Sequence, residues 1–128
     1  MKILFDNREI VESNECYLHD SSVISLEYKP ISRNLILNLE TLLDEKTNKY
    51  KAIIELKNIQ HIEINNQFIC ATNCNDEING WELVELSDVK NYKQTNIFNE
   101  QKPFGVMFEF FCQAKLYIVA TEIEFNRI

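Results

Sequence analysis

Apolar and polar residues alternate with a period of two along several short stretches of this chain. In residues 35–42, Leu35, Leu37 and Leu39 fall on one face of an extended segment. The same spacing recurs in residues 23–29, 50–57, 59–64 and 104–110. Because successive side chains of a strand point to opposite faces, this period predicts strands with one buried face. Two further strands are expected at 81–86 and 116–125, and residues 68–73 are read as a strand or one helical turn.

Polar turns separate these stretches, and the chain has no strands alternating with amphipathic helices of roughly 10–15 residues, which argues against a parallel α/β sheet. The composition agrees, because 16 Ile and 6 Val stand against only 4 Ala. We therefore expect an all-β fold, or a β-rich α+β fold with at most one short helix near 5–13. The architecture expected is an antiparallel sandwich or barrel of about seven or eight strands. Since no linker divides the 128 residues, one domain over 1–128 is predicted.

The predicted strands at 104–110 and 116–125 would form a long hairpin that ends the chain. With Gln113 and Ala114 as a two-residue loop, Phe110 would face Tyr117 and Phe108 would face Val119. Such aromatic cross-strand pairs on one face stabilise a hairpin.

The net charge of −7 constrains the partners of this chain. An acidic surface repels phosphate backbones and anionic lipid surfaces, so neither nucleic acid nor a membrane is expected as a partner. The same charge favours a basic protein partner through electrostatic steering. The first eight residues lack the apolar region of a signal peptide, and no apolar stretch reaches the length of a membrane span, so a cytoplasmic location is expected.

Four cysteines, at positions 16, 70, 74 and 112, raise the question of disulfides or a metal site. In a reducing compartment these thiols stay free, and Cys70 and Cys112 lie in apolar surroundings typical of buried positions. A zinc site formed by Cys16, Cys70, Cys74 and His61 would rest on a single Cys-x3-Cys pair. Structural zinc sites most often show two such pairs, so we expect no metal and no cofactor.

The motifs of common enzyme classes are missing from the sequence. The only glycines, Gly80 and Gly105, form neither a Gly-x-Ser-x-Gly elbow nor a phosphate-binding loop. The His19-Asp20 pair resembles part of a metal site, but two histidines are too few for a His-Asp phosphohydrolase, and Asp20 is expected to shape a turn. Glutamates on the predicted strands are expected on the solvated face of the sheet; these are Glu55, Glu63, Glu109, Glu122 and Glu124.

One resemblance concerns the order of the early segments. Leu18-His19-Asp20-Ser21 precedes the strands Val23-Ile24-Ser25-Leu26-Glu27-Tyr28, Leu35-Ile36-Leu37-Asn38-Leu39 and Ile53-Ile54-Glu55-Leu56-Lys57-Asn58-Ile59. This order resembles that of small bacterial all-β proteins of unknown function, some of them immunity proteins of polymorphic toxin systems. The resemblance implies an all-β fold and a protein partner, and it brings no catalytic residues with it.

Two functions from different classes are carried forward. The leading hypothesis is a non-enzymatic interaction protein that neutralises a toxin, with Trp81, Glu82, Glu85 and Asp88 as the binding patch, although Trp81 is also a natural core residue. The alternative is a small-ligand-binding or catalytic β-barrel in which His19, Tyr28 and His61 converge in a pocket. A homodimer formed through an exposed sheet edge is compatible with both.

Overall fold

The computed structural model describes residues 1–42, 49–65, 77–93, 101–110 and 114–128. Within this part of the chain lie nine strands and three short 3-10 helices. Their bounds are β1 Lys2–Ile3, η1 Phe5–Glu12, η2 Asn14–Cys16, β2 Ser21–Lys29, β3 Asn34–Leu42, β4 Lys49–Lys57, β5 His61–Asn65, β6 Glu77–Val84, η3 Leu86–Asp88, β7 Phe104–Phe110, β8 Lys115–Ala120 and β9 Glu122–Arg127. The short helix expected near 5–13 is therefore present as η1, and the predicted strand or turn at 68–73 lies outside the described residues.

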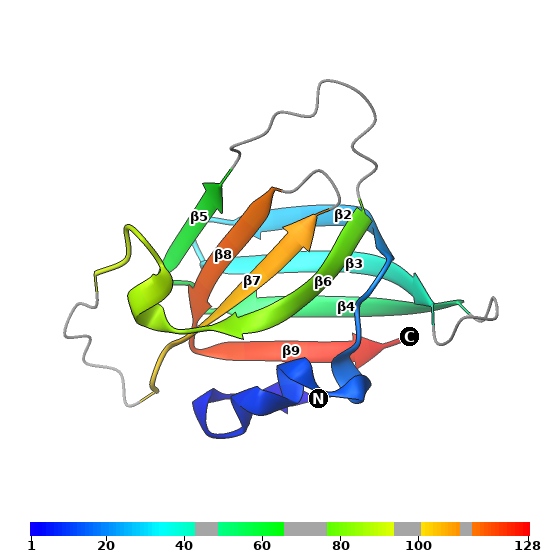
Figure 1. The fold of residues 1–128 in the computed structure, drawn as a ribbon, viewed down its shortest axis with the longest axis horizontal. Coiled ribbons are helices and arrows are strands. Elements are labelled where there is room, and N and C mark those ends of the chain that lie inside the picture. The colour runs from blue at the N-terminus through cyan, green and yellow to red at the C-terminus, as the bar shows by residue number, and fades with distance from the viewer. Residues whose placement is uncertain (43–48, 66–76, 94–100, 111–113) are drawn as a thin grey trace.

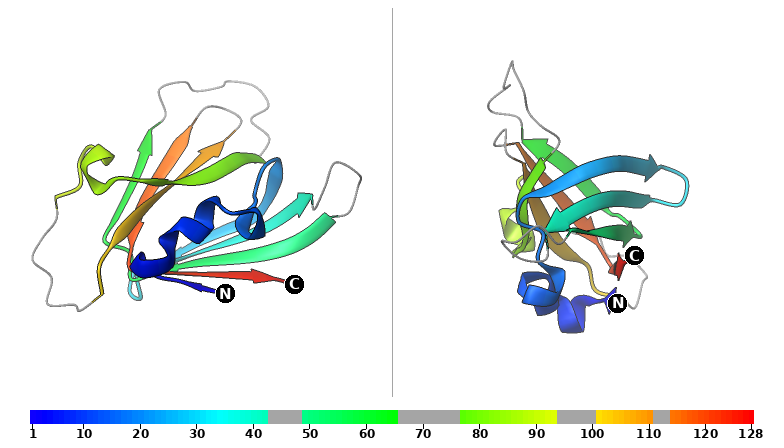
Figure 2. Two further views of the ribbon diagram at one scale, coloured as in Figure 1. Left: turned by 60° about the horizontal axis from the view of Figure 1, so that its bottom comes forward. Right: turned by 90° about the vertical axis from the view of Figure 1, so that its right-hand side faces the viewer.

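All nine strands belong to one antiparallel sheet with the order β1-β9-β4-β3-β2-β6-β7-β8-β5. The predicted all-β, antiparallel fold class is confirmed. The sheet is open and folds over itself, so that β9, β4, β3 and β2 form one layer and β6, β7, β8 and β5 cross in front of it (Figures 1 and 2). The apolar faces of the two layers meet in a single core.

The layers are joined at a corner around Thr121, the residue between β8 and β9. The side-chain amide of Asn58 donates to the Thr121 hydroxyl at 3.1 Å, and the Gln60 N–H donates to the Val119 carbonyl at 2.8 Å. Asn58 itself adopts a φ of 53°, a conformation that asparagine tolerates better than most residues. The predicted single strand 116–125 is therefore wrong, because the chain changes layer at Thr121.

The pairing of β7 with β8 also differs from the predicted hairpin. Phe108 pairs with Leu116 and Met107 pairs with Tyr117, so the register is shifted by three residues from the predicted one. β7 ends at Phe110, whose N–H donates to the Ala114 carbonyl at 2.9 Å, and Gln113 of the predicted two-residue loop lies outside the described residues. A shift by an odd number exchanges the faces of the paired residues.

The core confirms the alternation in β3 and β4. Leu35, Leu37 and Leu39 are buried on one face. They pair with Leu56, Ile54 and Ala52, which are buried on the same face. The alternation is misleading in β5, where Ile64 is 62% exposed. β6 begins at Glu77, four residues before its predicted start, and ends at Val84.

The N-terminal segment closes the bottom of the molecule beside β9 and β6 (Figure 1). The Met1 ammonium donates to the Phe125 carbonyl at 2.9 Å, so the two termini lie together. Helix η2 is fastened from two sides, because the Trp81 indole donates to the Cys16 carbonyl at 2.7 Å and the Arg127 guanidinium donates to the Glu15 carbonyl at 3.0 Å. None of the described helices has the length and apolar character needed to cross a membrane.

Candidate functional site

A groove of about 690 Å³ lies between η1 and the segment from β6 to η3. Its rim carries five carboxylates, from Glu9, Glu12, Glu82, Glu85 and Asp88. Arg8 is the one cationic residue of the described lining. Three of these carboxylates, Glu82, Glu85 and Asp88, belong to the patch predicted from sequence. We call this feature the acidic groove.

Apolar residues form the rest of the acidic groove. Phe5 contributes from η1, Leu83, Val84 and Leu86 from β6 and the turn after it, and Phe104 from β7. The close approach depends on Gly105, because a Cβ at that position would lie 2.9 Å from Val84 Cγ2 and 3.6 Å from Leu86 Cδ2. Apolar surface surrounded by charged side chains is the usual anatomy of a protein-binding site.

One hydrogen bond holds η1 at the side of β6, and the contacts of Arg8 lie within η1. The Leu83 N–H donates to Glu12 Oε1 at 3.1 Å, which satisfies a backbone group on the open edge of β6. Arg8 donates to the Phe5 carbonyl at 2.8 Å, and its guanidinium lies 4.0 Å from the centre of the Phe5 ring. Arg8 also lies 4.0 Å from Glu9 and offsets the charge of one carboxylate, so the five carboxylates of the lining still leave the groove with a net negative charge.

Trp81, the fourth residue of the predicted patch, lies in the core. Its exposed fraction is 9%, and its ring stacks on Phe108 and Phe125 with centroid distances of 5.3 and 6.2 Å. The indole N–H is used by the Cys16 carbonyl. Trp81 therefore positions β6 beneath the patch and offers no exposed ring to a partner.

A second hollow, of about 300 Å³, adjoins the acidic groove at Glu82 and contains His19. The Nδ1 atom of His19 lies 2.6 Å from the Asn79 carbonyl oxygen, and its Nε2 atom lies 3.4 Å from the Asp20 carboxylate. Asp20 has a φ of 58°, in keeping with the turn that the sequence predicts before β2. These two contacts orient the imidazole, whose side chain remains 51% exposed.

His19, Tyr28 and His61 do not converge. The hollow that His19 lines contains neither of the other two residues. His19 precedes β2, whereas Tyr28 lies near its end, and seven residues of extended chain from Ser21 to Tyr28 span about 23 Å at roughly 3.3 Å per residue. His61 contacts Glu63 and the ring of Tyr92 instead. The structure thus gives the predicted barrel pocket no common site.

His61 and Glu63 form a small polar cluster on the outer side of β5. The Nε2 atom of His61 lies 3.1 Å from Glu63 Oε1, which also accepts the Asn91 N–H at 3.2 Å. The hydrogen bond from His61 is the main cause that lowers the pKa of the Glu63 carboxyl. Tyr92 donates to Gln60 Oε1 at 3.0 Å. These bonds hold the segment after η3 against β5, and a structural role accounts for them.

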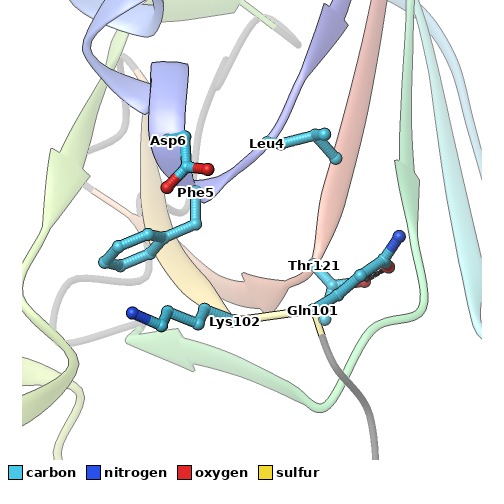
Figure 3. A pocket seen from close by; sticks show the side chains of 6 residues that line it. All are labelled: Leu4, Phe5, Asp6, Gln101, Lys102 and Thr121. Carbon is cyan, nitrogen blue, oxygen red and sulfur yellow. Dashed lines mark hydrogen bonds between the residues drawn. The ribbon is translucent and has the colours of Figure 1, made fainter.

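A third hollow, of about 270 Å³, lies at the base of η1 (Figure 3). Asp6, Phe5 and Lys102 line one side, and the Lys102 ammonium lies 5.2 Å from the centre of the Phe5 ring. On the other side the Thr121 hydroxyl donates to Gln101 Oε1 at 3.1 Å. The Thr121 hydroxyl also accepts from Asn58 and so belongs to the corner between the layers.

Only part of the zinc set considered from the sequence lies in the described residues, namely Cys16 and His61. Cys70 and Cys74 lie outside the described residues, as does Cys112. Burial raises the pKa of the Cys16 thiol to about 11, which disfavours the thiolate that zinc requires. In the described ranges no group of three or more His, Cys, Asp or Glu side chains is arranged to hold a metal ion.

Sequence reasoning missed Glu9 and Glu12, the two groove carboxylates of η1. Their distance along the chain from Glu82 is about seventy residues, and only the fold brings them together. The spacing of charges in residues 5–12 contains no signal that this helix faces β6. Comparisons of the chain with protein-family models, curated proteins and solved structures found no match.

Proposed function

We propose that this chain is a non-enzymatic protein-interaction module that binds a basic protein partner in the acidic groove. The observation that carries the proposal is the convergence of five carboxylates from two distant parts of the chain around an apolar surface. Net charge alone would spread carboxylates over the whole surface. Their concentration here creates a field that steers a cationic partner, and the apolar residues between them supply contact area.

The partner proposed is a toxin whose basic active-site face the groove covers. Occlusion of this kind needs no catalytic group on the inhibitor. The resemblance in the order of the early strands to bacterial immunity proteins supports the same assignment. A toxin that acts on a phosphate-rich substrate holds it on a cationic face. Five carboxylates would mimic the phosphates of that substrate and bind to the same face.

The test begins with the full chain as bait and the product of the neighbouring gene as prey. Binding is then measured by calorimetry for the wild type and for the double variant Glu82→Lys/Glu85→Lys. We expect at least a tenfold loss of affinity, or about 1.4 kcal/mol, because each substitution places an ammonium where the partner presents one. The control is Glu15→Lys/Glu27→Lys, which makes the same charge change at two exposed residues outside the groove.

A functional readout separates occlusion from simple attraction. Co-expression of the chain should abolish the toxicity of the partner in cells, and Glu82→Lys/Glu85→Lys should restore that toxicity while the control pair does not. If both double variants bind the partner with equal affinity, the acidic groove is not the binding site. Binding without any protection of the cells would reject toxin neutralisation and retain the binding surface.

A further inference from the structure

One face of β2 continues the face of β3 that packs in the core, yet on β2 this face is exposed to solvent. Leu26 pairs with Leu37, and Tyr28 pairs with Leu35. Paired residues of antiparallel strands point to the same face. Nevertheless Leu26 is 48% exposed and Tyr28 is 43% exposed, whereas both β3 leucines are fully buried. The core face of the sheet therefore continues into solvent on β2.

The cause is the divergence of β6 from β2. The two strands pair only through Ser21 with Ile78 and Ser22 with Glu77. The register of β2 against β3 then shifts between Val23 and Ser25, and a bulge of this kind bends a strand. Among the described residues, no strand pairs with β2 from Val23 to Lys29 on the side away from β3. An open edge beside exposed apolar side chains is a template for another strand.

We propose that this edge pairs with the same edge of a second copy of the chain, as a two-fold symmetric antiparallel dimer through β2. Charge favours this occupant. Each copy carries a net charge of −7, so two copies can meet only where carboxylates are few. The charged residues in 21–34 are Glu27, Lys29 and Arg33, one acid against two bases. This part of the surface shares no residue with the acidic groove.

The sequence of β2 is self-complementary in one register. With the symmetry axis at Leu26, each Leu26 faces its counterpart, Tyr28 faces Ile24 of the other copy, and Ser25 faces Glu27. The apolar side chains then form one stripe across the dimer, and the polar side chains face each other on the opposite side. Ile24 is itself 55% exposed and gains cover in this arrangement.

Other positions of the two-fold axis along β2 create less favourable cross-strand pairs. An axis at Glu27 would place two carboxylates directly opposite each other, which is destabilising. An axis at Tyr28 would bring Leu26 opposite Pro30, which has no N–H to donate. An axis at Ser25 would bring Tyr28 opposite Ser22, which is already paired with Glu77 of β6, so the axis at Leu26 is preferred.

The dimer is weak. The three apolar side chains together expose on the order of 200–350 Å² per copy, taking roughly 150–250 Å² for each complete side chain. A standard interface buries about 800 Å² per partner, so we expect a dissociation constant on the order of micromolar or weaker. Added salt should strengthen the dimer, because it screens the repulsion between two acidic copies.

The test is sedimentation equilibrium of the full chain from about 5 to about 500 μM at low and high salt. We expect a monomer–dimer equilibrium in the wild type and at least a tenfold weaker one in Leu26→Lys, which places two ammonium groups at the axis. The matched control is Ile64→Lys, the same kind of change at an exposed apolar residue of β5, which is an end strand of the sheet and does not pair with β2. The control should dimerise like the wild type.

Three results would overturn the proposal: a wild type that stays monomeric at the highest concentration, a dimer that Leu26→Lys leaves intact, or a dimer that only Ile64→Lys disrupts. Circular dichroism establishes whether each variant folds. If Leu26→Lys does not fold, amide hydrogen exchange of the wild type decides, since protection of β2 amides must rise with protein concentration. The test uses no other protein, so its outcome is independent of the proposed function.

Discussion

The two glycines of the chain lie in similar strands but have opposite surroundings, and alanine substitution of each gives a sharp prediction. A Cβ at Gly105 would lie 2.9 Å from Val84 Cγ2 and 3.2 Å from the Val84 carbonyl oxygen, whereas a Cβ at Gly80 meets no atom within 4 Å. Neither glycine has a positive φ, so alanine fits both backbones. The carbonyl cannot rotate away as a side chain can, and Gly105→Ala must displace the end of β6.

The magnitudes follow from two opposing contributions. Overpacking a buried position costs about 1–3 kcal/mol, and replacing glycine by alanine stabilises by about 0.4–1 kcal/mol through the unfolded state. Gly105→Ala should therefore lower the free energy of unfolding by about 1–2 kcal/mol, and Gly80→Ala should raise it by about 0.5 kcal/mol. For a chain of this size the two Tm values should differ on the order of 5–15 °C.

Urea unfolding followed by far-ultraviolet circular dichroism measures both free energies under the same conditions. Equal stability of the two variants, or a more stable Gly105→Ala, would refute the reasoning, because it would mean that β6 adjusts without cost. A second consequence concerns function. Val84 contributes to the acidic groove, so Gly105→Ala should also weaken binding of the partner, while the net charge of the groove is unchanged.

Three further predictions rest on single contacts. Trp81→Phe should lower the free energy of unfolding by about 2–4 kcal/mol, because it leaves the Cys16 carbonyl without its donor and removes buried ring atoms. A decrease of the free energy of unfolding below about 1 kcal/mol, measured by urea unfolding, would contradict this. Glu63→Gln should reduce the loss of folding free energy in acid. A carboxyl whose pKa is lowered from 4.5 stabilises the fold above that pH and loses this effect as the pH falls through the lowered value. The control Glu27→Gln removes an exposed carboxyl and should leave the loss of folding free energy in acid unchanged. The Cys16 thiol, with its pKa raised to about 11, should resist iodoacetamide at pH 8 in the folded chain and react in urea, as peptide mass spectrometry can show; rapid native labelling would contradict its burial.

The layer formed by β3 and β4 could be predicted from sequence because its pairing is local. Strands that are close in sequence tend to pair with each other, as β3 and β4 do. Leu37 and Ile54 are buried as their alternation requires, because the crossing layer covers this face of the sheet. In β2 the same alternation fails to predict burial. Whether Leu26 is covered depends on where β6 leaves β2, which is a property of residues fifty positions away.

The change of layer at Thr121 had no local signal. Neither glycine nor proline interrupts 116–125, and the apolar residues continue on both sides of the bend. The bend is held by Asn58, whose side chain reaches Thr121 from the connection between β4 and β5. A hydrogen bond between residues 63 positions apart cannot be read from a period of two in either segment.

The candidate site could be predicted only in part, for the same reason. Glu82, Glu85 and Asp88 are close in sequence, and their grouping on one surface follows from the short segment that joins them. Glu9 and Glu12 become their neighbours through the contact of η1 with the β6 edge. A reading of local charge found one side of the groove and could not find the other.

The distribution of charge separates the two proposed surfaces experimentally. Binding in the acidic groove joins opposite charges, so salt should weaken it. Pairing through β2 joins two acidic copies at a surface with one acid and two bases, so salt should strengthen it. A salt titration of both equilibria should therefore give slopes of opposite sign. If both equilibria weaken with salt, the self-association is itself an attraction between unlike charges, and an interface built on Leu26 and Tyr28 would be the wrong explanation for it.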